Sequence, residues 1–157
     1  SMGPGGFVYF LDKSGLVFKV ADGGTGKTPL PTTGLSKSFK ANRITVAANE
    51  KVYILSSQNG SDGEIHEYDP STQKWKDTGG VGVDLDAAGN NVLAIDSNKD
   101  VVLYDDDNET WVTRNSLSAL PHAGNMTMQG IATFSSASPF TIVGTKYYSA
   151  FRVPYKQ

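Results

Sequence analysis

The segment VYILSS at residues 52–57 decides the fold of this chain, because a similar segment, VLAIDS, follows at residues 92–97. The two copies lie about 40 residues apart, a period typical of repeated structural units. Both are apolar up to their last two positions. A strand without polar alternation is buried on both faces, as it is in a sheet that lies between two others. The repeat therefore predicts a stack of β-sheets.

A second element repeats farther along each unit. In each copy a Tyr-Asp pair is followed by a polar turn and, after the same interval, by a tryptophan. The residues of the two copies are Tyr68, Asp69 and Trp75, and Tyr104, Asp105 and Trp111. The tyrosine ends one strand and the tryptophan begins the next, so each copy predicts an outer β-hairpin.

The rest of the chain consists of further short apolar runs, separated by turn residues such as Asn59-Gly60 and Asp62-Gly63. No longer window has an apolar period of about 3.6 residues, so we expect almost no helix. The predicted strands are Phe7–Leu11, Leu16–Val20, Ile44–Ala48, Val52–Ser56, Glu64–Tyr68, Val81–Leu85, Val92–Ile95, Val101–Tyr104, Thr110–Thr113, Gly130–Phe134, Phe140–Val143 and Tyr148–Val153. About four strands per unit favour the blades of a β-propeller over other repeat architectures.

The strand count leaves the closure of the ring open. With weaker candidates near Thr28–Thr32 and Lys74–Thr78, the chain has about fourteen strands, or about three and a half blades. The first unit lacks an innermost strand and the last lacks an outermost one. We expect an all-β fold, a β-propeller-like array of about four imperfect four-stranded antiparallel blades. The alternatives are a small closed ring, a fragment of a longer protein, or a partial ring that closes by homodimerisation.

Residues 68–75, which read Tyr-Asp-Pro-Ser-Thr-Gln-Lys-Trp, resemble the Tyr-Asp-Pro-x-Thr-x-x-Trp stretch of kelch repeats, and residues 104–111 are a weaker copy. The chain differs from that family at Ser56-Ser57, where kelch repeats have a Gly-Gly pair. The run Val92–Tyr104 is more similar to tectonin-type lectin repeats. The resemblance covers residues 43–115, roughly half the chain, and implies blade architecture and carbohydrate binding.

The function expected from these observations is that of a non-catalytic recognition module. Lectin-like carbohydrate binding, which the resemblance implies, needs an aromatic ring to stack on the sugar and polar groups to bind its hydroxyls. The predicted ligand-binding residues are therefore Trp75, Trp111, Tyr68, Tyr104, Asp69 and Asp105. The alternative is a protein–protein interaction or assembly domain that completes its propeller by homodimerisation. The structural alternative to ligand binding is that both tryptophans pack between blades.

Composition argues against several other classes of function. The formal net charge is −2 and no basic run is present, so we expect no nucleic-acid partner. No apolar run is long enough to span a membrane, and the chain has no cysteine for disulfides or zinc. We expect no cofactor and no metal. The compartment, cytoplasmic or secreted, stays open.

Three motifs resemble catalytic or ligand sites but lack essential parts. The loop Ala21–Thr28 ends in Gly-Lys-Thr like a phosphate-binding loop, but prolines follow where a helix must begin. Asp84 and Asp86 begin like a calcium loop whose twelfth position holds isoleucine instead of glutamate. The two histidines are His66, expected at an exposed strand position, and His122, expected in a loop. We therefore expect no enzyme.

The domain organisation predicted from the sequence is simple. Residues 1–6 are expected to be the remnant of a cleaved tag and a flexible N-terminus, because Ser1-Met2 resembles what remains after an expression tag is cleaved. Residues 7–157 are expected to form a single β-propeller-like domain, a length that fits one domain.

Overall fold

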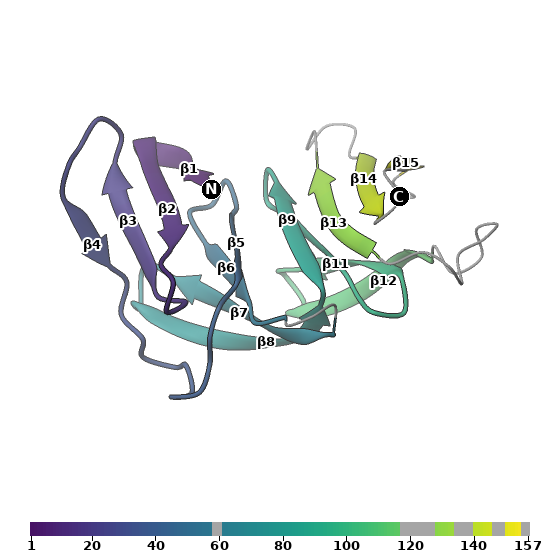
Figure 1. Ribbon diagram of the computed structural model, residues 1–157, viewed down its shortest axis with the longest axis horizontal. Helices are drawn as coiled ribbons and strands as arrows, with labels where there is room; N and C mark the ends of the chain where they lie inside the picture. The colour runs from purple at the N-terminus through teal and green to yellow at the C-terminus, as the bar shows by residue number, and fades with distance from the viewer. Residues whose placement is uncertain (58–60, 117–127, 134–139, 146–149, 155–157) are drawn as a thin grey trace.

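The computed structural model describes residues 1–57, 61–116, 128–133, 140–145 and 150–154, which form four antiparallel sheets (Figure 1). The first sheet contains β1 (Met2–Gly3), β2 (Phe7–Leu11), β3 (Val17–Ala21) and β4 (Lys27–Pro29). The second contains β5 (Arg43–Val46), β6 (Val52–Leu55), β7 (Gly63–Asp69) and β8 (Lys74–Gly82). The third contains β9 (Asp84–Ala88), β10 (Asn91–Ile95), β11 (Asp100–Asp105) and β12 (Thr110–Ser116). The fourth contains β13 (Met128–Thr133), β14 (Phe140–Thr145) and β15 (Ala150–Pro154).

Each sheet is a meander, in which consecutive strands pair as neighbours. The first strands of successive sheets, β1, β5, β9 and β13, contact one another in that order. The sheets therefore follow an arc, with the first and the fourth sheet at its two ends (Figure 1). Within the described ranges the one helical element is a 3₁₀ turn at Pro4–Gly6. The expected all-β fold of about four blade-like sheets is confirmed.

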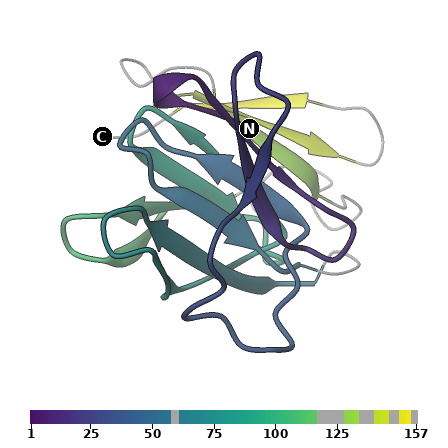
Figure 2. The same cartoon turned by 90° about the vertical axis from the view of Figure 1, so that its left-hand side faces the viewer.

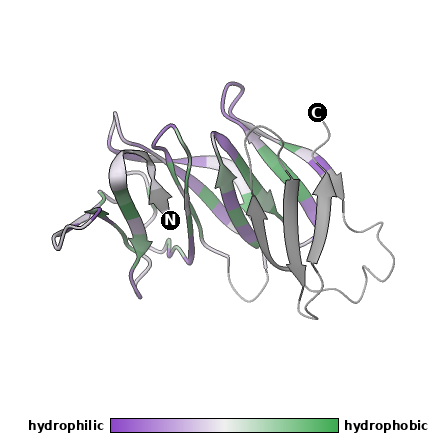
Figure 3. Cartoon of the chain, turned by 90° about the horizontal axis from the view of Figure 1, so that it is seen from above, coloured by the Kyte–Doolittle hydropathy of each residue, from purple (hydrophilic) through white to green (hydrophobic). Residues whose placement is uncertain are grey.

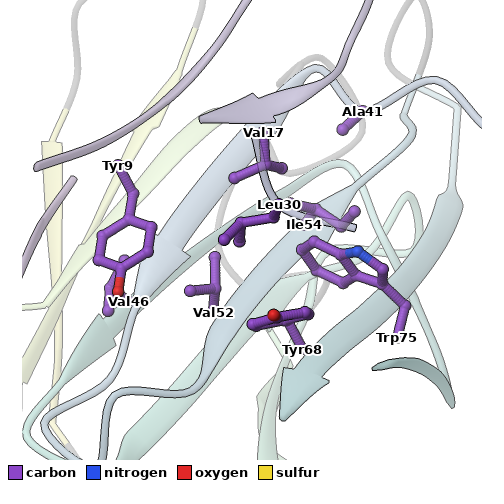
Figure 4. Packing of buried hydrophobic residues seen from close by; sticks show 9 residues of the cluster. All are labelled: Tyr9, Val17, Leu30, Ala41, Val46, Val52, Ile54, Tyr68 and Trp75. Carbon is purple, nitrogen blue, oxygen red and sulfur yellow. The ribbon is translucent and has the colours of Figure 1, made fainter. Parts of the chain in front are cut away.

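Two hydrophobic clusters hold the first three sheets together. The cluster between the first and second sheets contains Tyr9, Val17, Leu30, Ala41, Val46, Val52, Ile54, Tyr68 and Trp75 (Figure 4). The cluster between the second and third sheets contains Ala47, Tyr53, Leu55, Ile65, Leu85, Val92, Ala94 and Tyr104. Hydrophobic segments accordingly lie along the strands of the two middle sheets in the view from above (Figure 3).

Strand β6 explains why the repeated segment lacks polar residues. Because successive side chains of a strand point to opposite faces, Val52 and Ile54 join the first cluster, and Tyr53 and Leu55 join the second. All four are at most 1% exposed. Each side chain of this kind contributes about 1.5–3 kcal/mol when it is fully buried. The prediction of a strand buried on both faces is confirmed.

The structure differs from the sequence prediction at several boundaries. Met2 and Gly3 belong to the first sheet, because they pair with β2, and the Ser1 ammonium donates to the Tyr9 carbonyl at 2.8 Å. The first sheet thus has an innermost strand after all. The predicted strand Val81–Leu85 is divided at Val83, which is the whole connection between β8 and β9.

Candidate functional site

The two Tyr-Asp…Trp elements form equivalent outer hairpins of the second and third sheets. Tyr68 pairs with Trp75 across β7 and β8, and Tyr104 pairs with Trp111 across β11 and β12. In both pairs the ring centroids are 5.1 Å apart. The structure thus brings the predicted site residues together within each hairpin, but divides them between two sheets.

The two aspartates of these elements stabilise the hairpin turns. The Asp69 carboxylate accepts hydrogen bonds from the Ser71 amide at 2.8 Å and from its hydroxyl at 2.6 Å. The Asp105 carboxylate accepts from the Asn108 side-chain amide at 2.8 Å. The hydrogen bonds from the Ser71 and Asn108 side chains lower the pKa of Asp69 and of Asp105, respectively, below the ordinary value. Stabilisation of the two turns therefore explains why an aspartate occupies both positions.

Trp75 is enclosed by the connection between the first and second sheets. Its indole N–H donates to the Pro31 carbonyl at 2.7 Å, and its backbone N–H donates to the Thr33 carbonyl at 2.8 Å. Gly34 lies against the Trp75 backbone, where a side chain on a residue with φ of +97° would not fit. Only 4% of Trp75 and 5% of Tyr68 are exposed, so neither ring offers a face to a ligand here.

Trp111 bridges the third sheet to the second. Its indole N–H donates to the Thr78 hydroxyl of β8 at 3.1 Å, and the ring lies directly on Gly80. Trp111 is half-buried, and its neighbour Tyr104 is buried. Both tryptophans therefore pack against a neighbouring element, although Trp111 stays partly accessible.

An ion-pair network joins the second and third sheets beside these rings. The Lys51 ammonium lies 2.9 Å from the buried Glu67 carboxylate and 2.5 Å from Asp106. Burial by itself lowers the pKa of Lys51, but its hydrogen bonds to Asp106 and Glu67 outweigh burial and raise it. Tyr53 donates to Glu67 at 3.3 Å, and burial raises the pKa of Tyr104 to about 12. Sequence reasoning missed this network, because its members lie far apart in the chain.

The inner strands are also linked by polar side chains. Arg43 of β5 donates to Asp84 of β9 at 2.9 Å, and Thr45 donates to Asp86 at 3.4 Å. The aspartates that resembled a calcium loop therefore lie on a strand and bind side chains of the next sheet. Among the described residues no group of three or more His, Cys, Asp or Glu side chains is placed to hold a metal ion.

A hollow of about 410 Å³ lies where the connection between the first two sheets passes the ends of β7 and β8. Phe39 and Val81 supply its apolar surface, and 48% of Val81 is exposed. Lys40, Asp62 and Glu64 supply charges, and four serines and a glycine complete the lining. Asp62 is held in place by the Ser97 amide, which donates to it at 2.7 Å. We call this feature the β8 hollow.

His66 is buried beside Phe39 and Glu64, two residues that line the β8 hollow, and does not lie on an exposed strand face, which corrects the sequence prediction. The residue is 6% exposed, and its ring packs edge-on against Phe39 at a centroid distance of 4.5 Å. Its Nε2 lies 3.5 Å from the Glu64 carboxylate, whereas its buried Nδ1 has no hydrogen-bond partner in the described part of the chain. The other histidine, His122, lies outside the described residues.

The remaining motifs adopt ordinary conformations. The Gly-Lys-Thr loop connects β3 to β4 as a hairpin, so no helix follows it. Nowhere in the described part is there a helix long and apolar enough to cross a membrane.

Comparisons with known proteins identify the fold. No known protein family and no curated protein sequence matches this chain. It is similar to the solved structure of YCF48 bound to a D1 peptide, with a TM-score of 0.66 and 16% identity over 99% of this chain and 51% of that one. It is also similar to a Mycobacterium tuberculosis puromycin-hydrolyzing peptidase, with a TM-score of 0.50 and 18% identity over 88% of this chain and 24% of that one.

At these identities the similarity concerns the fold alone. YCF48 is a β-propeller, so the β-propeller prediction is confirmed, and the open arc fits a partial propeller. The chain spans about half the length of YCF48 and about a quarter of the peptidase. The resemblance to kelch and tectonin repeats in particular stays a prediction.

Proposed function

We propose that this chain is a non-catalytic recognition module that binds an extended protein segment in the β8 hollow. The hollow carries the proposal, because its volume of about 410 Å³ lies in the range of about 300–1,000 Å³ that is usual for ligand sites. YCF48, which is similar in fold, is bound to a peptide in its solved structure, and this favours a protein segment as ligand.

The lining of the β8 hollow defines the kind of peptide that fits. Val81 and Phe39 offer an apolar contact for one side chain. Glu64, whose side chain is 65% exposed, lies at the rim and attracts a basic residue next to that apolar one. A peptide with an aromatic or aliphatic residue beside Lys or Arg is therefore the expected ligand.

A catalytic role has less support at this position. The polar neighbour of the His66 ring is Glu64. The hydrogen bonds of the lining serines run elsewhere: the Ser56 hydroxyl accepts from the Glu64 amide, and the hydroxyls of Ser36 and Ser38 bond to each other. The nucleophile, base and orienting group that a hydrolytic triad needs are thus not assembled around His66.

The proposal is tested by selecting peptides from a displayed random library on the immobilised chain and measuring their affinity by fluorescence anisotropy. We expect Val81→Lys to weaken the selected peptides by at least about tenfold. Leu16→Lys is the matched control, because Leu16 is also an exposed apolar residue, at 42%, and is not one of the residues that line the hollow. If no peptide is selected, or if both variants bind equally well, the proposal is wrong.

Carbohydrate is the second candidate ligand, since the resemblance to tectonin-type repeats implies it and Trp111 is partly accessible beside a polar turn. A glycan array probed with the same chain tests this directly. A glycan that binds the wild type and is lost in Trp111→Ala would favour carbohydrate over peptide. Assembly with a second copy is the other form of protein interaction that the sequence predicts.

A further inference from the structure

The first sheet has an apolar face that no described blade covers. Its middle strands pair Val8 with Val20 and Phe10 with Phe18, so these four side chains lie on one face. The opposite face, with Tyr9 and Val17, is the one that packs on the second sheet. The rings of Phe10 and Phe18 stack at 5.6 Å. We call Val8, Phe10, Phe18 and Val20 the end face.

Comparing burial along equivalent strands shows that the end face lacks a covering sheet. Strand β6, which lies between two sheets, is buried at every position, whereas β2 is buried only at Tyr9 and half-buried at its other four positions. Among the described strands, β2 and β3 make their main contacts only with β1, β4 and β5. Figure 2 looks at the molecule from this end of the arc, with the first sheet nearest the viewer.

The sequence of β2 indicates that its second face is also covered in the functional assembly. FVYFL at residues 7–11 is as free of polar residues as VYIL of β6, although in the described part of the chain one of its faces meets another sheet and the other does not. A sheet with one solvated face normally alternates polar and apolar residues. An open propeller edge and an apolar blade face are both liable to associate.

A second copy of this chain has the geometry to cover the end face. The chain matches 51% of YCF48 over 99% of its own length, so two copies would together match about the full length of that propeller. Two times four sheets lies within the usual range of about four to eight blades. At the other end of the arc, the fourth sheet packs on the third through β13 and has no further described sheet beyond it.

We infer that two copies close a ring head to tail, with the end face of each packed against the fourth sheet of the other. A twofold axis along the centre of the ring generates two identical seams and leaves no blade face open. This inference rests on the proposed function as a protein-interaction module and names the partner of one surface. It does not involve the β8 hollow.

Light scattering coupled to gel filtration over a range of concentrations tests the stoichiometry. The wild type is expected at twice the 16.8 kDa of one chain. Phe10→Lys is expected at the mass of one chain, and Val81→Lys, an equally drastic change outside the end face, at the mass of two. If Phe10→Lys fails to fold by circular dichroism, Val20→Lys replaces it. A wild type that is monomeric throughout overturns the inference and leaves the end face to another occupant, such as further blades of a longer chain.

Disulfide trapping tests the head-to-tail arrangement, since the natural chain has no cysteine. Lys27 pairs with Val20 in β4 and therefore lies on the end-face side. A Lys27→Cys chain mixed with Arg152→Cys or Val153→Cys chains of β15 is expected to form mixed disulfide dimers with one of the two. Dimers of Lys27→Cys alone would mean that two end faces meet each other, and would overturn the arrangement. Peptide binding by a monomeric chain would leave the proposed function intact while this inference failed.

Discussion

Replacing Gly80 by alanine tests whether Trp111 fastens the third sheet to the second. A Cβ atom at Gly80 would overlap the indole of Trp111, which must move and lose its hydrogen bond to Thr78. Overpacking costs about 1–3 kcal/mol, and the lost hydrogen bond adds about 0.5–1.5 kcal/mol. We therefore expect Gly80→Ala to lower the free energy of unfolding by about 2–4 kcal/mol.

A double-mutant cycle separates this contact from other effects of the substitution. In a Trp111→Ala background the Cβ meets no indole, so Gly80→Ala should then cost less than about 1 kcal/mol. Gly79→Ala is the matched control: it has nothing within 4 Å but a φ of +68°, so its cost of about 1–2 kcal/mol should be the same in both backgrounds. Urea unfolding followed by circular dichroism gives each free energy. Additive costs for Gly80→Ala and Trp111→Ala would refute the inter-sheet role of the indole.

Three further predictions concern the same region. Lys51→Met leaves the Glu67 carboxylate buried without its cation, so we expect a loss of about 3 kcal/mol in urea unfolding at neutral pH. Because the pKa of Lys51 is raised, this loss should be full below pH 10.5 and shrink as the pH rises further. Tyr104 should keep its proton up to about pH 12 in the folded chain, whereas the unfolded chain loses this proton near pH 10. The free energy of unfolding should therefore fall as the pH rises between these values. Phenolate absorbance should appear together with the loss of structure. Acrylamide should quench Trp111 in Trp75→Phe more strongly than Trp75 in Trp111→Phe, since Trp75 is 4% exposed; equal quenching would contradict the enclosure of Trp75.

Much of the fold could be predicted from the sequence because strand burial leaves a direct pattern. Val52–Leu55 has no polar residue since its two faces meet two different cores, and the strand pairs of the hairpins follow from turn residues. The boundary at Val83 could not be predicted, because one residue that changes sheets leaves no turn signal. Strand β1 was missed for a similar reason: a two-residue strand of Met2 and Gly3 has no period.

The burial of His66 shows that the exposure of a side chain could not be predicted from the sequence of its own strand. Its neighbours Glu64 and Glu67 made the strand look solvent-exposed. Glu67, however, is buried because Lys51 neutralises it, and His66 is covered by Phe39 from the connection that crosses the sheet. Both partners come from outside the strand, so the local alternation of polar residues gives the wrong exposure. Long-range pairing of this kind is not encoded in a strand's own sequence.

The residues that repeat most clearly serve the structure of each blade, and there is a physical reason for this. Every inner blade needs a turn and an aromatic pair to seal its outer hairpin, so Asp69 and Trp75 recur as Asp105 and Trp111. The β8 hollow, by contrast, depends on features that the junction between the second and third sheets lacks. The long connection that carries Phe39 joins the first and second sheets, whereas Val83 alone joins the second and third. In a repeat protein of this type, positions where one blade differs from the others are therefore better candidates for ligand recognition than positions that all blades share. Measuring how Val81→Lys changes peptide binding and how Trp111→Ala changes glycan binding tests this difference directly.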